Sequence, residues 1–146
     1  MIPITPQSRY DALVKLREGK IGREIFSDRE IYEEELERVF TRAWLFVGHE
    51  SQVPNPGDFF TSRMGAESVI LARDKKKKVH VFLNSCRHRG MKVCQYDHGN
   101  TQLFTCPYHS WSYTTDGKLF GVPQFKQLYE GCMDKEEWSL IEVPNM

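Results

Sequence analysis

The sequence lacks the features that mark several large classes of protein. Among its 146 residues no apolar run approaches the ~20 residues that span a bilayer, and the first residues lack the basic start and apolar core of a signal peptide. Twenty basic and twenty acidic residues cancel, so the charge balance favours neither a nucleic acid nor an anionic membrane as partner. Repeats, low-complexity tracts and interdomain linkers are absent as well. We therefore expect a cytoplasmic protein without a membrane anchor, of a size that buries a real core.

Cysteine is also scarce, with four in the chain, and in a reducing compartment cysteines serve as metal ligands more often than as disulfides. Two of the four stand close to a histidine, in Cys86-Arg-His88 and in Cys106-Pro-Tyr-His109. An Arg-Gly pair after the first motif and a proline inside the second place both motifs in loops. One thiolate and one imidazole from each of two loops suit a diiron centre in which one iron takes two sulfurs and the other two nitrogens. This is the Rieske 2Fe-2S arrangement.

A structural zinc ion is the competing interpretation, because tetrahedral Cys2His2 coordination uses the same four side chains. Most zinc modules, however, keep their cysteines in one half of the motif and their histidines in the other. Here the two residue types alternate within each loop. We therefore predict that Cys86 and Cys106 bind one iron and that His88 and His109 bind the other.

The other three histidines, His49, His80 and His98, share no helix and no His-x(4)-His spacing. A mononuclear iron that activates oxygen needs two histidines and a carboxylate clustered around open coordination positions. We therefore expect structural roles for the three, near the end of a strand, at an alternating strand position and in a turn, respectively. No apolar segment among the strand-like patterns is recognisable as a substrate cavity.

Helical patterns are confined to the N-terminal part of the chain. One short helix is predicted over residues 8–18. A second, over residues 29–43, begins at a capping box formed by Ser27 and Glu30 and places its apolar side chains on one face. Its run of glutamates is interpreted as a solvated face rather than as a docking surface. Residues 1–43 are therefore predicted to be a helical lead.

Strand-like patterns follow, so residues 44–146 are predicted to form a mainly β domain of antiparallel sheets, with the ligand loops within about residues 84–113. The four lysines of residues 74–78 are interpreted as a solubilising hairpin turn, with the steering of an acidic electron donor as the alternative. The predicted strands cover residues 59–63, 68–73, 79–84, 102–105, 111–113, 118–122 and 138–143, after an apolar run at 44–47 and with turns at 54–58, 97–100 and 115–117.

Three motifs resemble the Rieske segment of the large (α) subunit of aromatic ring-hydroxylating dioxygenases. They are Cys-Arg-His-Arg-Gly-Met at residues 86–91, Phe-Thr-Cys-Pro-Tyr-His-Ser-Trp at 104–111 and Asp-Gly-Lys-Leu at 116–119. The likeness covers nearly the whole chain from about residue 25, including Ala-Trp-Leu-Phe-Val-Gly-His-Glu at 43–50 and Lys-Glu-Glu-Trp at 135–138. One departure is Ser110, where many relatives carry glycine. A hydroxyl there could donate to a cluster sulfur and raise the potential.

The resemblance implies a Rieske iron-sulfur fold of antiparallel β-sheets, with the two loops forming a cluster-binding subdomain. It also implies that a ferredoxin or reductase delivers electrons, which the 2Fe-2S cluster passes to a mononuclear Fe(II) in the catalytic domain of the same or a neighbouring α subunit. A small β subunit is a possible further partner in this family. The catalytic domain follows the Rieske domain in those enzymes, so we expect this chain to lack it and to be inactive in hydroxylation alone.

Two other functions stay open. A free-standing Rieske ferredoxin would carry electrons and catalyse nothing, and a zinc-stabilised module would only bind. Family ferredoxins are usually shorter and lack the Trp-Leu-Phe-Val-Gly-His-Glu segment at 44–50, which favours the oxygenase α subunit.

The redox potential is expected to be low for a Rieske cluster. High-potential relatives carry a disulfide between the two loops, whereas the corresponding positions here are Met91 and Tyr108. We therefore predict a potential nearer ~−150 mV than ~+300 mV. The remaining cysteines, Cys94 and Cys132, are expected to be small buried apolar residues rather than halves of a disulfide.

Overall fold

The computed structural model describes residues 9–130 and 132–146 of the chain. The chain divides into two compact units, Met1–Trp44 and Leu45–Met146. Within the described ranges, no helix has both the length and the apolar character that crossing a membrane requires.

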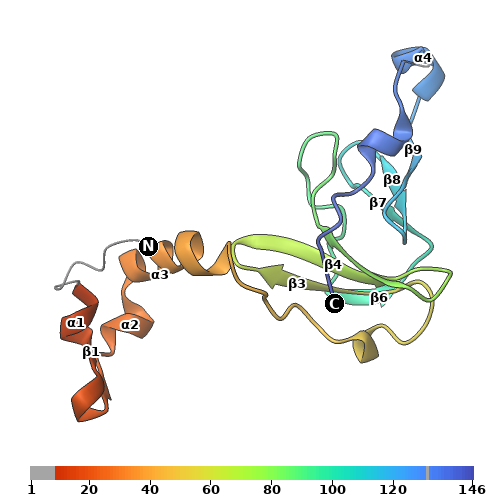
Figure 1. The fold of residues 1–146 in the computed structure, drawn as a ribbon. Coiled ribbons are helices and arrows are strands. Elements are labelled where there is room, and N and C mark those ends of the chain that lie inside the picture. Colours follow the sequence, from red (N-terminus) through yellow and green to blue (C-terminus); the bar gives the residue numbers. More distant parts are fainter. Residues whose placement is uncertain (1–8, 131) are drawn as a thin grey trace. The chain divides into compact units, whose positions relative to one another are not determined.

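The first unit consists of short helices and one small hairpin (Figure 1). The predicted helix over residues 8–18 is wrong beyond Leu13, because the next two residues pair with a second short strand; Ser8 itself lies outside the described residues. The elements are α1 (Arg9–Leu13), β1 (Val14–Lys15), a 3-10 helix (Leu16–Glu18), β2 (Lys20–Ile21), α2 (Glu24–Ser27), α3 (Arg29–Glu35) and a π-helical turn (Leu36–Phe40).

Helix α3 begins at Arg29, as predicted, but its N-cap is Asp28 rather than Ser27. The Asp28 carboxylate accepts hydrogen bonds from the N–H groups of Glu30 (2.8 Å) and Ile31 (3.1 Å), which is the geometry of an N-cap. Ser27 instead belongs to α2, where its hydroxyl donates to the Arg23 carbonyl. Asp28 and Ser27 are both good capping residues, and the end of α2 at Ser27 decides between them.

The second unit contains two antiparallel sheets, which confirms the mainly β fold (Figure 1). One sheet has the strand order β5-β4-β3-β6 and the other the order β7-β8-β9. The strands are β3 (Asp58–Met64), β4 (Glu67–Arg73), β5 (Val79–Leu83), β6 (His98–Asn100), β7 (Leu103–Thr105), β8 (Ser112–Thr114) and β9 (Leu119–Gly121), accompanied by α4 (Phe125–Tyr129) and two 3-10 helices (Glu50–Gln52 and Lys135–Trp138).

Strand β6 occupies a segment for which the sequence predicts a turn. His98, Gly99 and Asn100 pair with Phe60, Phe59 and Asp58 of β3. Asn100 also donates from its side chain to the Asp58 carboxylate at 2.7 Å. The glycine suits the pairing because a Cβ there would press on the Phe59 ring. The local composition is typical of a turn, but the long-range pairing with β3 overrides it.

The predicted strand at residues 138–143 is also wrong, and the apolar run at 44–47 does not become a strand. Residues 44–47 form no regular structure. In the C-terminal segment, Trp138 ends a 3-10 helix and a single bridge joins Glu142 to Phe82. Backbone hydrogen bonds from Leu83 N–H to Ile141 and from Val143 N–H to Val81 nevertheless hold this segment along β5.

The main core fills the space between the sheets and the ligand loops. It includes Phe82 of β5, Phe104 of β7 and Tyr113 of β8, all nearly inaccessible to solvent. The turn before β9 approaches this core so closely that a Cβ on Gly117 would collide with the Phe82 ring. The two ligand cysteines predicted from the sequence belong to the same cluster of buried side chains, so the core of the domain and the walls of the site are one structure.

Candidate metal centre

The first ligand loop follows β5 directly. Cys86 donates its backbone N–H to the Met91 carbonyl (2.8 Å) and accepts the N–H of Gly90 at its own carbonyl (2.8 Å). Gly90 has φ 71°, a left-handed conformation that glycine adopts without a steric cost. The loop therefore closes on itself, with Cys86 buried at its base and His88 half-buried toward its tip.

The second ligand loop has the same backbone pattern. Cys106 donates to the Trp111 carbonyl (2.8 Å) and accepts the N–H of Ser110 (3.0 Å). Ser110 stands at the position that corresponds to Gly90 and has the same left-handed conformation, with φ 57°. Its side chain is exposed. Strands β7 and β8 flank this loop and pair from Thr105↔Ser112 outward.

The two cysteine side chains meet inside the core. Their residues are 3% and 2% exposed, and the pKa of Cys106 is raised, first by burial and further by the neighbouring Cys86 thiol. The Tyr113 hydroxyl lies 3.3 Å from Cys86 Sγ and accepts the N–H of Arg87 at 3.1 Å. Tyr113 comes from β8, so a strand of the second loop holds the backbone of the first. Burial beside the two thiols raises the pKa of Tyr113 well above its usual range, which keeps its hydroxyl proton available as a donor.

The two histidine side chains form a second pair. The rings of His88 and His109 lie 4.7 Å apart between centroids, at 70° to each other. The indole of Trp111 stacks on His88 at 4.8 Å with its plane only 9° away, and Tyr108 lies against His109. Burial, and then the neighbouring His109 and Arg89, lower the pKa of His88. The neutral imidazole that a metal requires is therefore the favoured form of His88.

One nitrogen of the histidine pair has no partner. The Nδ1 atom of His109 is buried and makes no hydrogen bond to any described residue. Buried polar atoms in proteins are nearly always satisfied, so such an atom needs an explanation. A metal ligand bond explains it, and the soft thiol pair together with the imidazole pair matches the donor set of a Rieske cluster. The residues present therefore fit the group.

The four predicted ligands thus come together as two pairs rather than around one point. Across residues 9–130 and 132–146, no three His, Cys, Asp or Glu side chains are grouped so as to hold one metal ion. The sulfur pair lies in the core, while both histidines are partly exposed. This division by residue type is what an arrangement with two metal positions requires.

The remaining histidines have structural partners. His49 caps a 3-10 helix, where its ring nitrogen accepts the N–H of Ser51, and it does not end a strand. His98 is an exposed residue of β6 rather than of a turn. His80 lies in β5 as expected, buried between the carboxylates of Asp74 (3.2 Å) and Glu142 (2.8 Å). These contacts tie β5 to the hairpin before it and to the C-terminal segment.

Sequence reasoning missed several residues that support the loops, above all Asn84, Trp111 and Tyr113. All three were interpreted only as members of predicted strands, at 79–84 and 111–113. A tyrosine at a buried strand position next to a ligand motif is itself a signal, because a buried hydroxyl needs a partner. Asn84 gave a similar signal, as a polar residue at the end of an apolar strand.

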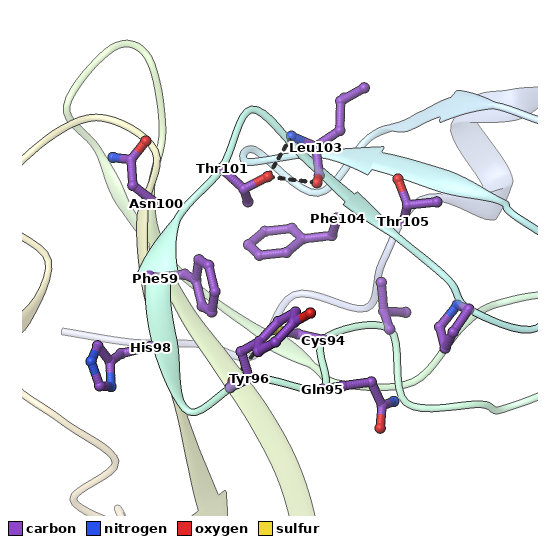
Figure 2. A pocket seen from close by; sticks show the side chains of 13 residues that line it. Phe59, Cys94, Gln95, Tyr96, His98, Asn100, Thr101, Leu103, Phe104 and Thr105 are labelled. Atoms are coloured by element: carbon purple, nitrogen blue, oxygen red, sulfur yellow. Dashed lines mark hydrogen bonds between the residues drawn. The ribbon is translucent and has the colours of Figure 1, made fainter.

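A pocket of about 510 Å³ lies beside the second loop (Figure 2). Phe59 and Phe104 meet edge to face within it, at 5.5 Å between centroids. Leu103 is held at its rim by hydrogen bonds of both backbone groups to the Thr101 hydroxyl. Cys94, one of the spare thiols, lines the pocket. The sequence offers no sign of this pocket, because its lining residues come from segments that lie far apart in the chain.

The spare cysteines are both free thiols in the structure, as are the two in the loops. Cys94 is buried, which raises the pKa of its thiol, and its Sγ donates to the Tyr96 carbonyl. Cys132 is exposed rather than buried as expected. Met91 and Tyr108, which stand where high-potential relatives have a loop-to-loop disulfide, are largely exposed.

Comparison with known proteins places this geometry in a family. Residues 43–138 match the family model described as the Rieske [2Fe-2S] domain. The chain is 46% identical over 136 residues to the benzene 1,2-dioxygenase subunit alpha of Pseudomonas putida, which covers 93% of this chain and 30% of the relative. It is 48% identical over 145 residues to the biphenyl dioxygenase subunit alpha of Paraburkholderia xenovorans, covering 95% and 31%. The chain thus spans about a third of the length of these curated relatives.

A solved structure shows the same fold. Naphthalene 1,2-dioxygenase from Rhodococcus sp., bound to indole, superimposes with a TM-score of 0.81 at 40% identity, over 88% of this chain and 29% of that one. The family model described above matches residues 43–138, which is more than half of the chain. The chain therefore belongs to the Rieske [2Fe-2S] domain family.

Proposed function

We propose that Cys86 and Cys106 bind one iron of a Rieske 2Fe-2S cluster and that His88 and His109 bind the other. The observation that carries the proposal is the sorting of the four side chains into a thiol pair and an imidazole pair. A single tetrahedral zinc would instead need all four donors to converge on one point. The buried, unpartnered Nδ1 of His109 supports the same assignment.

When bound, the cluster takes up and releases one electron at a time. The residues around the cluster position would have different roles. The core covers the sulfur pair, and the Tyr113 hydroxyl faces one of those sulfurs as a hydrogen-bond donor. The partly exposed histidine pair, with Tyr108 beside it, is the side of the site closest to solvent. Electrons therefore have their shortest way in and out on the histidine side.

We further propose that the domain is the electron-transfer portion of an aromatic ring-hydroxylating dioxygenase α subunit. The named relatives support this, since they are the alpha subunits of benzene and biphenyl dioxygenases. The donor would be a ferredoxin or reductase. The acceptor would be a mononuclear Fe(II) in a separate catalytic domain, of the same or a neighbouring α subunit, and a small β subunit is the further proposed partner.

The cluster assignment is tested on purified residues 1–146. We expect reddish-brown protein, iron and acid-labile sulfide in the ratio of a 2Fe-2S cluster, and a Rieske-type EPR signal on reduction. The midpoint potential should lie nearer ~−150 mV than ~+300 mV, because no disulfide joins the loops. Colourless protein that holds zinc would overturn the assignment.

The electron-transfer role is tested by an assay for hydroxylation of aromatics, which the domain alone should not perform. With a reductase, ferrous iron, oxygen and simple aromatics, we expect the cluster to be reduced and reoxidised without formation of cis-dihydrodiols or phenols. The reason is that oxygen activation needs an iron with open positions, and the described residues offer no grouping of His and carboxylate ligands to hold one. Product formation by this chain alone would contradict the proposal.

A further inference from the structure

The two ligand loops are closed at their bases in different ways. The second loop stands on the β7–β8 ladder, with Thr105↔Ser112 as the innermost pair. The first loop leaves β5 after Leu83 and returns through residues 91–97, which belong to no strand. Backbone pairing therefore closes the base of one loop, and something else must close the other.

The side chain of Asn84 occupies the place of the missing ladder. Its Oδ1 accepts the N–H of Cys94 at 2.9 Å, and its Nδ2 donates to the carbonyl of the same residue at 2.8 Å. A side-chain amide with one acceptor and one donor thus pairs with both backbone groups of one residue, as a neighbouring strand would. Asn84 is 4% exposed and Cys94 7%, so water cannot replace these bonds.

The position of Asn84 links this pairing to the site. Asn84 precedes Cys86 by two residues, and Cys94 lies ten residues beyond Asn84, at the end of the limb that carries Met91. Met91 in turn accepts the Cys86 N–H. Asn84 is itself fixed to β4, because its backbone N–H donates to the Ser68 carbonyl at 2.8 Å. Both ends of the first loop are therefore tied to the sheet through one residue.

We propose that Asn84 is a positioning residue for the metal centre, which does for the first loop what the β7–β8 ladder does for the second. Its amide holds the two limbs of the loop at a set spacing and so keeps the Cys86 thiol facing Cys106. The inference rests on the proposed cluster assignment. It goes beyond that assignment because Asn84 touches neither the ligands nor the metal position.

The test compares Asn84→Ala with Asn100→Ala. Asn100 also ties two segments together through its amide, at the Pro56 carbonyl and the Asp58 carboxylate, but it lies outside both loops. In the cluster-loaded chain we expect Asn84→Ala to lose iron to a chelator about 10-fold faster than wild type, as loss of a supporting hydrogen bond does in other metal sites. Its Rieske EPR signal should broaden or shift. Asn100→Ala should lower the melting temperature and leave both readouts unchanged.

The conservative variant Asn84→Asp keeps the acceptor for the Cys94 N–H and loses the donor to the Cys94 carbonyl. It also places a carboxylate oxygen against that carbonyl in a buried position, so it should lose iron at least as fast as Asn84→Ala. If Asn84→Ala matches Asn100→Ala, with a lower melting temperature but an unchanged EPR signal and rate of iron loss, the residue is only structural and the proposal is overturned.

Hydrogen exchange on the wild-type chain gives a readout that depends neither on a variant folding nor on the cluster. We expect the Cys94 amide to be protected to the same degree as the amides of the β7–β8 ladder, in the apoprotein as well as in the loaded form. Rapid exchange at Cys94 would refute the role of Asn84 even where the cluster assignment holds. Protected exchange in a chain that binds no cluster would refute the cluster assignment, and with it the positioning role at a metal centre, while the Asn84–Cys94 pairing itself would stand.

Discussion

The two ligand loops reach the same backbone geometry on different supports. In each, the cysteine N–H donates to the carbonyl five residues on, and the cysteine carbonyl accepts the N–H four residues on. The first loop has glycine at the left-handed position and a side-chain amide at its base, while the second has serine and a strand ladder. The geometry is thus a property of the hydrogen-bond pattern, and several local sequences can supply it.

The loops also differ in where they place histidine. It stands two residues after cysteine in the first loop and three after in the second, yet the rings meet at 4.7 Å. Stacking on Trp111 orients the first ring, and packing against Tyr108 orients the second. Aromatic neighbours, rather than an equal spacing of cysteine and histidine, therefore bring the two imidazoles together. Four experiments test how far the equivalence of the loops extends.

Removal of one thiol from either loop should have the largest effect, and the same effect in both. Cys86→Ala and Cys106→Ala should each abolish the Rieske EPR signal, because one iron would keep a single protein ligand. Cys132→Ala, which changes an exposed and free thiol, is the matched control and should keep the full signal. A complete cluster in one of the two loop variants would show that the loops are not equal contributors.

Loss of the link between the loops should have the next largest effect. Tyr113→Phe removes a donor to Cys86 Sγ and the acceptor of the Arg87 N–H. We expect a lower midpoint potential, because a hydrogen bond to a ligand sulfur favours the more electron-rich reduced cluster. We also expect a loss of about 2 kcal/mol in the free energy of unfolding from the unpaired N–H.

Redox titration and urea unfolding measure the two effects of Tyr113→Phe separately. Tyr96→Phe is the control, because its ring is exposed. An unchanged or higher potential in Tyr113→Phe would mean that the hydroxyl does not donate to the cluster sulfur.

Acid should weaken the strand that leads into the first loop. Burial by itself would raise the pKa of Asp74, but hydrogen bonds from the Lys78 N–H and from His80 outweigh it, and the pKa is lowered from its ordinary value of 3.8. A carboxylate with a lowered folded pKa contributes stability above its unfolded pKa and loses it as the pH falls through the folded value. Asp74→Asn should therefore cost about 2 kcal/mol at pH 7.

The difference between wild type and Asp74→Asn should shrink as the pH falls below 3.8. Urea unfolding midpoints of wild type and of Asp74→Asn, measured from pH 7 downward, report this difference in stability. A difference that stays constant through this range would show that the charge of Asp74 contributes nothing and that only its shape matters.

Exchange of the residues at the left-handed positions should have the smallest effect. A non-glycine residue in this conformation costs about 1 kcal/mol, so Ser110→Gly should raise the free energy of unfolding by that amount. Gly90→Ser should lower it equally, since a Cβ there would meet nothing closer than Ser85 Oγ at 3.8 Å. Urea unfolding of both variants and of the double exchange measures the effect. A loss of stability in Ser110→Gly would reveal a contact of the serine hydroxyl.

Features that depend on neighbouring residues could be predicted from the sequence. The ligand motifs, the strands from β3 to β5 and the hairpin turn at Gly117 follow from spacing, alternation and turn chemistry, which act over a few residues. The four ligands could be named because the alternation of cysteine and histidine is itself a local signal. Their sorting into two pairs followed from the known chemistry of such donors.

Features that depend on distant partners could not be predicted from the sequence and are seen only in the folded chain. β6 exists because β3 offers its segment a pairing edge, and residues 138–143 form no strand of their own although they run along β5. Asn84 and Tyr113 acquire their roles from Cys94 and Cys86, which lie 10 and 27 residues away. Local propensity is worth a fraction of a kcal/mol per residue, whereas a buried polar group without its partner costs about 1–3 kcal/mol, so the fold settles these positions.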